Sequence, residues 1–193
     1  RDGDGTSDMM DGWTSQNPNF VLDANNPRSS DFNAVDFSPD GSEVATSSDD
    51  GYIRIWNTST GQNVRSVIAV SGGGTGKLSW SADGRFIGVT SQAADEFDIY
   101  YASNLTSVHG ALSSDVGGGD YTYDIDISPD GTKAAVAIGR SGNGGTNGVV
   151  RVMDVINGTV MQNLNPGGED RFHSVDFSPS GSHIAIGTVG DYY

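Results

Sequence analysis

The sequence predicts an all-β protein made of β-propeller blades, each a sheet of four antiparallel strands, with about three and a half blades present. Two observations carry this prediction. A four-residue turn motif recurs at intervals of 43, 47 and 50 residues, and glycine is frequent, with 28 copies in 193 residues and no collagen period. Propeller blades repeat every ~40–50 residues, and short strands joined by glycine-rich turns are typical of all-β folds.

The recurring motif is expected to form the hairpin between the first and second strands of each blade. Proline presets the backbone at the first corner of a turn, aspartate bonds the local backbone, and glycine tolerates a positive φ. The copies are Ser38–Gly41, Ser81–Gly84, Ser128–Gly131 and Ser178–Gly181. We call these the SPDG turns.

Strand-like segments surround each SPDG turn. Apolar residues two apart, which share one face of a strand, end the first strands at Val35–Phe37, Leu78–Trp80, Ile125–Ile127 and Val175–Phe177. Second strands are expected at Glu43–Ser48, Arg85–Ser91, Lys133–Gly139 and His183–Val189. Third strands are expected at Tyr52–Trp56, Phe97–Tyr101 and Val149–Asp154, and fourth strands at Asn63–Val67, Ser107–Leu112 and Thr159–Leu164.

The sequence divides into three predicted parts. Residues 1–12 are interpreted as a partial calcium loop, residues 13–30 as a linker with a short strand at Phe20–Leu22, and residues 31–193 as blades. The blades span residues 31–70, 71–114, 115–167 and 168–193, of which the last is incomplete. Closed propellers contain ~4–8 blades, so we expect this sequence to belong to a longer protein or to pair with other copies.

The stretch Phe37–Gln62 resembles the WD40 repeat family and the related YVTN-type surface propellers. The resemblance rests on the SPDG turn, a strand of small residues, an acidic turn and the sequence IRIW. No blade has the family's Gly-His pair, and the closing Trp-Asp appears only as Trp56-Asn57, Tyr101-Ala102 and Met153-Asp154. The resemblance implies propeller blades in which the Asp–His–Ser–Trp network of hydrogen bonds is incomplete.

The composition excludes several classes of function. The net charge is −15, from 25 acidic and 10 basic residues, which argues against partners made of nucleic acid or anionic membrane. No apolar run approaches the ~20 residues of a membrane span, so membrane insertion is not expected. Cysteine is absent, which excludes disulfides and cysteine-based metal sites. Aspartates that ligate cations, or a saline environment, would account for the charge.

The first residues fit the spacing of an EF-hand calcium loop. With Gly5 at loop position 6, oxygen ligands fall at positions 3, 5, 7, 9 and 12, and position 1 precedes Arg1. These ligands are Asp2, Asp4, Thr6, Asp8 and Asp11. The segment is also similar to the DGDG loops of thrombospondin type 3 and dockerin-like proteins, which implies Ca²⁺ as cofactor and an extracellular or cell-surface location. The alternative is an acidic linker.

Candidate surface sites lie at the two ends of the blades. Three N-x-S/T sequons follow the third strands, at Asn57, Asn104 and Asn157, and they predict either glycans or plain turns at the same end as the SPDG turns. Loops at the opposite end carry acidic residues that we expect to bind a cation or a basic partner, or to be solvated turns. They are Asp95, Glu96, Asp115, Asp120, Glu169 and Asp170.

No catalytic set is recognisable. The three histidines have no partner at metal-ligand spacing, and Ser71–Lys77 lacks the first glycine and the following helix of a phosphate-binding loop. Asp36, Asp126 and Asp176 share one repeat position, which favours holding turns or bridging blades over acid–base chemistry.

We therefore expect a secreted or cell-surface scaffold that binds proteins or other copies of itself, without catalysis. One alternative is part of a propeller enzyme, a hydrolase or lyase acting on polysaccharide or peptide. The other is a structural protein that self-associates through open blade edges.

Overall fold

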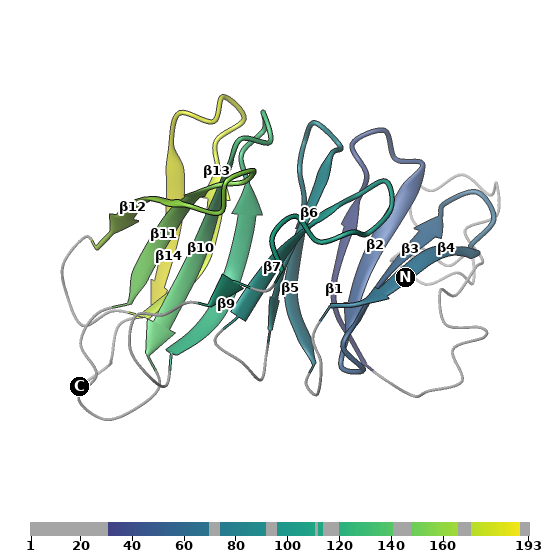
Figure 1. Cartoon of the computed structure of the whole chain (residues 1–193), viewed down its shortest axis with the longest axis horizontal. Helices are drawn as coiled ribbons and strands as arrows, with labels where there is room; N and C mark the ends of the chain where they lie inside the picture. Colours follow the sequence, from purple (N-terminus) through teal and green to yellow (C-terminus); the bar gives the residue numbers. More distant parts are fainter. Residues whose placement is uncertain are drawn as a thin grey trace, which may run out of the picture.

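The computed structural model describes residues 31–69, 74–91, 96–110, 112–113, 120–140, 148–165 and 171–189. All regular structure in these residues is β-strand, arranged as four antiparallel sheets that stand side by side in sequence order (Figure 1). In the described part of the protein there is no helix with the length and apolar character of a membrane span.

Each sheet is one blade or part of one. Blade 1 contains β1 (Phe32–Phe37), β2 (Glu43–Ser48), β3 (Tyr52–Asn57) and β4 (Asn63–Ile68). Blade 2 contains β5 (Thr75–Trp80), β6 (Phe86–Ser91), β7 (Glu96–Tyr101) and β8 (Leu112–Ser113). Blade 3 contains β9 (Asp120–Ile127), β10 (Lys133–Arg140), β11 (Val149–Asp154) and β12 (Val160–Leu164). The fourth sheet contains β13 (Arg171–Phe177) and β14 (Ile184–Val189).

The predicted all-β blade architecture is confirmed, with one difference in blade 2. Its outer strand was expected at Ser107–Leu112, but β8 has only two residues, and Ser107 makes an isolated bridge to Tyr100. The backbone of Gly110 turns here with a φ of 82°, and His109 Nε2 lies 2.6 Å from the carbonyl oxygen of Val155 in blade 3. The segment therefore leaves the sheet to contact the neighbouring blade.

The hydrophobic core lies between the blades. Ile53 and Ile55 of blade 1 belong to one cluster with Leu78 and Trp80 of blade 2. The same arrangement joins blade 2 to blade 3 and blade 3 to the fourth sheet. The first strand of each following sheet therefore packs its apolar face on the preceding blade.

The SPDG turns adopt the predicted conformation. In the first turn, the N–H of Gly41 donates to the carbonyl of Ser38 at 2.8 Å, and the carboxylate of Asp40 accepts bonds from the hydroxyl of Ser38 at 2.7 Å and the N–H of Ser42 at 3.0 Å. These bonds lower the pKa of Asp40 to about 2. The turn glycines have φ between 67° and 78°, a conformation that a side chain would strain.

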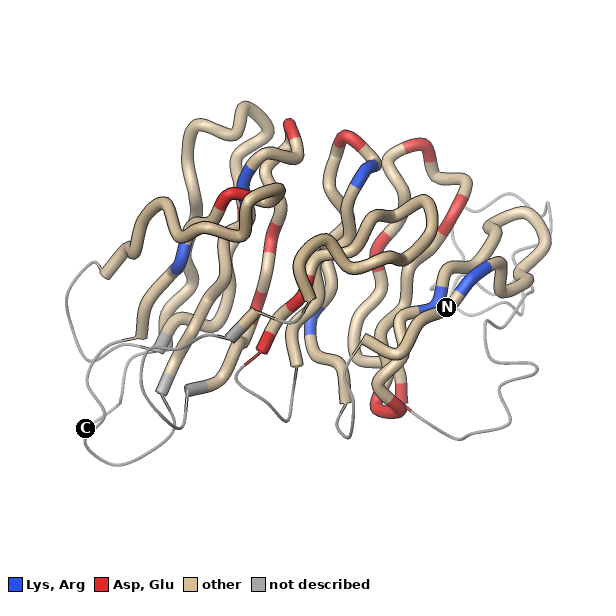
Figure 2. Tube along the Cα trace, viewed as in Figure 1, with Lys and Arg blue, Asp and Glu red and all other residues tan. Residues whose placement is uncertain are grey.

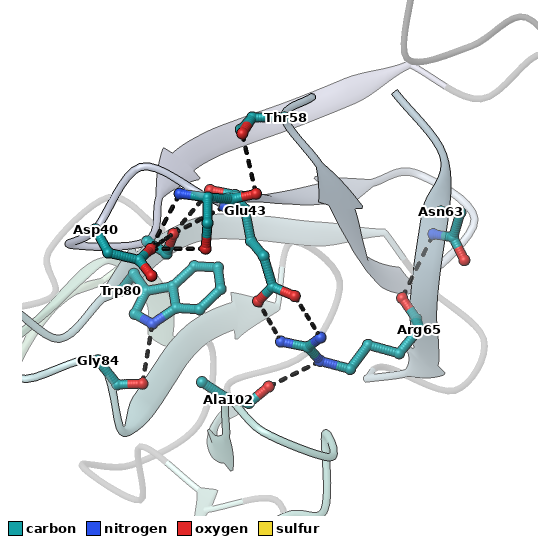
Figure 3. Close-up of polar contacts among 10 residues, drawn as sticks. Asp40, Glu43, Thr58, Asn63, Arg65, Trp80, Gly84 and Ala102 are labelled. Carbon is teal, nitrogen blue, oxygen red and sulfur yellow. Dashed lines mark hydrogen bonds and ion pairs between the residues drawn. The ribbon is translucent and has the colours of Figure 1, made fainter. Parts of the chain in front are cut away.

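Polar contacts near the SPDG turns join blades 1 and 2 (Figure 3). Arg65 of β4 donates two bonds to the carboxylate of Glu43 in β2, at 2.7 and 2.5 Å. Its Nε also donates to the carbonyl of Ala102 in blade 2 at 2.9 Å. One side chain thus ties the outer strand of blade 1 to its own sheet and to the next blade.

Candidate functional site

The first strands of the four sheets form the inner edge of the structure, since β1 contacts β5, β5 contacts β9 and β9 contacts β13. Each strand has a register irregularity near its start, five residues before the SPDG serine. The extra residues are Asn33, Tyr123 and His173, and in β5 the irregularity lies at Gly76 and Lys77. β-Bulges re-aim side chains and are frequent beside functional sites. We call this end of the inner strands, opposite the SPDG turns, the entrance end.

Side chains at the entrance end contact one another across blades. The ring of Tyr123 stacks on His173 of the fourth sheet, with 4.2 Å between centroids and 17° between planes. The ring centroids of Tyr121 and Tyr123 lie 6.3 Å apart. Asn33 Nδ2 of blade 1 donates to the carbonyl of Thr75 in blade 2 at 2.7 Å. The bulges therefore assemble one continuous surface from all four sheets.

A pocket of about 350 Å³ opens between blades 1, 2 and 3 at this end. Its lining includes Asn33, Lys77, Thr90, Tyr121 and Tyr123. The volume is in the range of known small-ligand sites, which combine aromatic walls with a few polar groups.

Aspartates on the inner strands bridge neighbouring sheets, as their repeat position predicted. Asp36 Oδ2 accepts the backbone N–H of Trp80 at 2.7 Å, and Asp126 Oδ2 accepts that of Phe177 at 2.7 Å. The hydroxyl of Ser79 also donates to Asp126 at 2.8 Å. Asp126 thus connects blade 2, blade 3 and the fourth sheet, and its burial raises its pKa. The blade-bridging role is confirmed for Asp36 and Asp126.

One link of the WD40-type hydrogen-bond network is present in blade 1. Trp56 Nε1 donates to the hydroxyl of Thr46 at 2.8 Å, and both side chains are buried. In blade 2, the hydroxyl of Ser107 donates to buried Asp98 at 2.9 Å, and burial raises the pKa of Asp98. Thr46 and Asp98 were not singled out from the sequence, because each lies inside an ordinary strand pattern.

The predicted acidic loop residues fall only partly within the described structure. Glu96 begins β7 and is exposed, and Asp120 begins β9, where its backbone pairs with Arg140. Asp95, Asp115, Glu169 and Asp170 lie outside the described residues, as do the predicted calcium ligands Asp2, Asp4, Thr6, Asp8 and Asp11. Among described residues, no group of three or more His, Asp or Glu side chains is placed to hold a metal ion.

The three sequons lie beside the SPDG turns, where the repeat predicted them. In blade 1 the N–H of Thr58 donates to the carbonyl of Ser42 at 3.0 Å, and in blade 3 the N–H of Val155 donates to the carbonyl of Thr132 at 3.0 Å. The side-chain oxygen of Asn57 accepts two N–H bonds of its own turn. Asn104 and Asn157 are exposed. Glycosylation of the three asparagines stays a prediction.

The histidines do not gather into one site. His109 contacts the Val155 carbonyl, His173 stacks on Tyr123, and His183 Nδ1 lies 2.9 Å from the hydroxyl of Ser182, directly after the fourth SPDG turn. The tertiary structure instead groups Lys77 with Tyr121 and Tyr123. The sequence signal for these side chains was their position relative to the SPDG serine, four residues before it for Lys77 and five for Tyr123.

Comparisons with known proteins agree with the fold. Residues 17–57 match the family model described as WD domain, G-beta repeat, a stretch that begins before β1 and ends with β3. The protein is similar to the β-propeller domain of Cps50 (Swd1) from Myceliophteria thermophila, with 15% identity and a TM-score of 0.69. That match covers 83% of this protein and 51% of the other, so the sequence spans about half the length of that propeller. No curated protein matches the sequence. The protein is therefore a run of β-propeller blades, and its residues 17–57 match the WD40 repeat model.

Proposed function

We propose that this protein is a non-catalytic scaffold that binds another protein across the entrance end of its inner strands. The observation that carries the proposal is the row of bulges at one repeat position, which turns Asn33, Lys77, Tyr123 and His173 toward one end of four adjoining sheets. Proteins with WD40 repeats are typically protein-binding scaffolds, which supports this interpretation. Inter-sheet bonds such as those of Asp126 hold the surface in place.

The charge of the protein bears on the partner. Acidic residues lie at the ends of the sheets and along the inner strands, while lysines and arginines are few (Figure 2). A net charge of −15 favours association with a partner whose overall surface is basic, because complementary fields speed encounter. This long-range effect is screened beyond ~8 Å at physiological salt, so it selects the partner's overall charge and leaves individual contacts to local chemistry.

A matched pair of tyrosines tests the proposal. Tyr121 at the entrance end and Tyr101 near the SPDG turns are 40% and 38% exposed. We expect the immobilised Tyr101→Ala variant to retain the partner protein from the native source and the immobilised Tyr121→Ala variant to lose it. Quantitative cross-linking measures the amount of partner that each variant retains. Equal retention by both variants would contradict the proposed location.

Self-association is the second candidate, because one apolar blade face is open. Val35 and Phe37 of β1 are 62% and 56% exposed, whereas their repeat equivalents in later sheets are buried. Two results would favour this candidate. The protein itself would be recovered as the cross-linked partner, and its mass in light scattering would rise with concentration.

The proposal extends to Ca²⁺ at residues 1–12, which the spacing of the first aspartates supports, and to an extracellular or cell-surface location, which the similarity to DGDG loops supports. Calorimetric titration of the protein with Ca²⁺ is expected to give a binding heat that the Asp4→Asn/Asp8→Asn variant lacks. A protein that takes up no Ca²⁺ at millimolar concentration would exclude the calcium site.

A further inference from the structure

Most polar groups that line the entrance-end pocket are already used inside the protein. Asn33 Nδ2 donates to Asp49 Oδ1 and to the carbonyl of Thr75, both at 2.7 Å. The hydroxyl of Thr90 accepts the backbone N–H of Lys77 at 2.9 Å. The hydroxyl of Thr122 donates to the carbonyl of Glu96 at 2.9 Å. These groups therefore shape the pocket and leave little hydrogen-bonding capacity for a ligand.

The donors left for a ligand are one ammonium group and two phenols. Lys77 is exposed and forms no ion pair with any described residue. The charge of Lys77 acts electrostatically on Asp124, whose carboxylate accepts the N–H of Val175 at 3.1 Å. Tyr121 is 40% exposed and Tyr123 is half-buried, and within the described structure neither hydroxyl makes a hydrogen bond. Lys77 is the only cation of the described pocket lining.

The backbone at Lys77 is closely constrained. A Cβ on Gly76 would lie 2.4 Å from the hydroxyl oxygen of Thr90, which is the atom that accepts the Lys77 N–H. Only glycine fits before Lys77 without displacing Thr90, so the start of the lysine side chain has a defined position at the pocket wall. The flexible four-carbon stem of the lysine side chain then carries the ammonium from this defined origin.

A ligand that complements this pocket must supply several acceptor oxygens and a single negative charge. A carboxylate has two oxygens and about four lone-pair sites, and it matches one ammonium in charge. A phosphate has up to two charges, which one lysine beside Asp124 in a protein of net charge −15 would not balance. The tyrosine rings add apolar area for a neighbouring part of a peptide.

We infer that this pocket binds a carboxylate of a peptide, with Lys77 as its counter-ion and the hydroxyls of Tyr121 and Tyr123 as further donors. The inference rests on the proposed protein-binding function and names the group that the partner inserts. The carboxylate belongs to a glutamate or aspartate of the partner or to its C-terminus. The partner's overall basic surface and this one acidic contact act at different distances and are compatible.

The inference is tested with three peptides and the 193-residue protein. The probes are acetyl-Ala-Glu-Ala-amide, its glutamine counterpart, and acetyl-Ala-Ala-Ala with a free C-terminal carboxylate, titrated while backbone chemical shifts are followed by NMR. The glutamate peptide is expected to shift the signals of residues 75–77 and 121–123 and to bind about 10–100-fold more tightly than the glutamine peptide, as lost bonds to a charged group predict. The third peptide shows whether a C-terminus serves equally well.

Lysine variants supply the control. Lys77→Gln is expected to weaken binding of the glutamate peptide about 10–100-fold, and Lys77→Arg is expected to retain this binding. Lys133→Gln, which removes the same charge beside an SPDG turn, is expected to leave binding of the glutamate peptide unchanged. An unaltered NMR spectrum away from the site shows that each variant is folded. Equal binding of the glutamate and glutamine peptides, an equal loss in Lys133→Gln, or tighter binding of inorganic phosphate would overturn the inference.

The two proposals fail in distinguishable ways. If Tyr121→Ala abolishes partner capture while no peptide carboxylate binds, the scaffold function stands and the carboxylate assignment is wrong. If the glutamate peptide binds through Lys77 while Tyr121→Ala retains the partner, the pocket stands and the proposed partner surface is wrong.

Discussion

The Phe177→Ala variant is expected to lose about 3–5 kcal/mol of unfolding free energy, the usual cost of removing a buried aromatic ring. Phe177 is 7% exposed and packs in the cluster between blade 3 and the fourth sheet, with Ala135 and Val150. The loss includes both the apolar area returned to water and the cavity that remains. Urea unfolding followed by circular dichroism measures it, and hydrogen exchange in β13 and β14 shows whether the fourth sheet opens first.

Phe37→Ala is the matched control, because Phe37 has the same residue type at the same repeat position, with 56% of its surface exposed. Its ring packs on no preceding blade in the described structure, so its removal is expected to cost less than about 1 kcal/mol. Equal losses in the two variants would show that packing between sheets does not hold the fold, contrary to the position of the core.

The Asp126→Ala variant is expected to lose about 1–3 kcal/mol of unfolding free energy. It leaves the N–H of Phe177 and the hydroxyl of Ser79 without their acceptor, at the point where blade 2, blade 3 and the fourth sheet meet. Asp176→Ala removes an exposed carboxylate at the same repeat position and is expected to change stability by less than about 0.5 kcal/mol. A cost as large for Asp176→Ala would contradict the bridging role.

The pH dependence of the Asp126→Asn variant separates the charge of Asp126 from its hydrogen bonds. Burial raises the pKa of Asp126 above its value of 3.8 in the unfolded state, so the folded state binds this proton more tightly. Its contribution to stability is therefore greatest below pH 3.8 and is lost as the pH rises through the raised pKa. Asparagine keeps one acceptor oxygen and no charge, so the variant is expected to be less destabilised than Asp126→Ala and to lack this pH-dependent loss. An unchanged pH profile would contradict the assigned cause.

Local chemistry made the blade pattern readable from the sequence. The turn residues around Asp40 and Asp130 bond to their own neighbours, and both carboxyls have a pKa of about 2 for that reason. Such bonds depend on a few adjacent residues, so each SPDG turn and the strand after it could be placed. The role of Asp126 was also predictable, because Asp36 shares its repeat position and likewise accepts an N–H bond from the following sheet. The short β8 was not, because the turn at Gly110 accompanies a contact with blade 3.

The sequence by itself determined the repeat, the strand faces and the end of the blades to which each turn belongs, because these follow from alternation and turn chemistry over short spans. Only the tertiary structure decided the candidate site. Lys77 in blade 2 and Tyr121 and Tyr123 in blade 3 are more than forty residues apart and share a pocket because β5 and β9 are neighbours. The bulges at Lys77 and Tyr123 lie where each inner strand pairs with its second strand. The packing of one blade beside the next is a long-range property, because it joins strands that are distant in the sequence, and no local pattern encodes it.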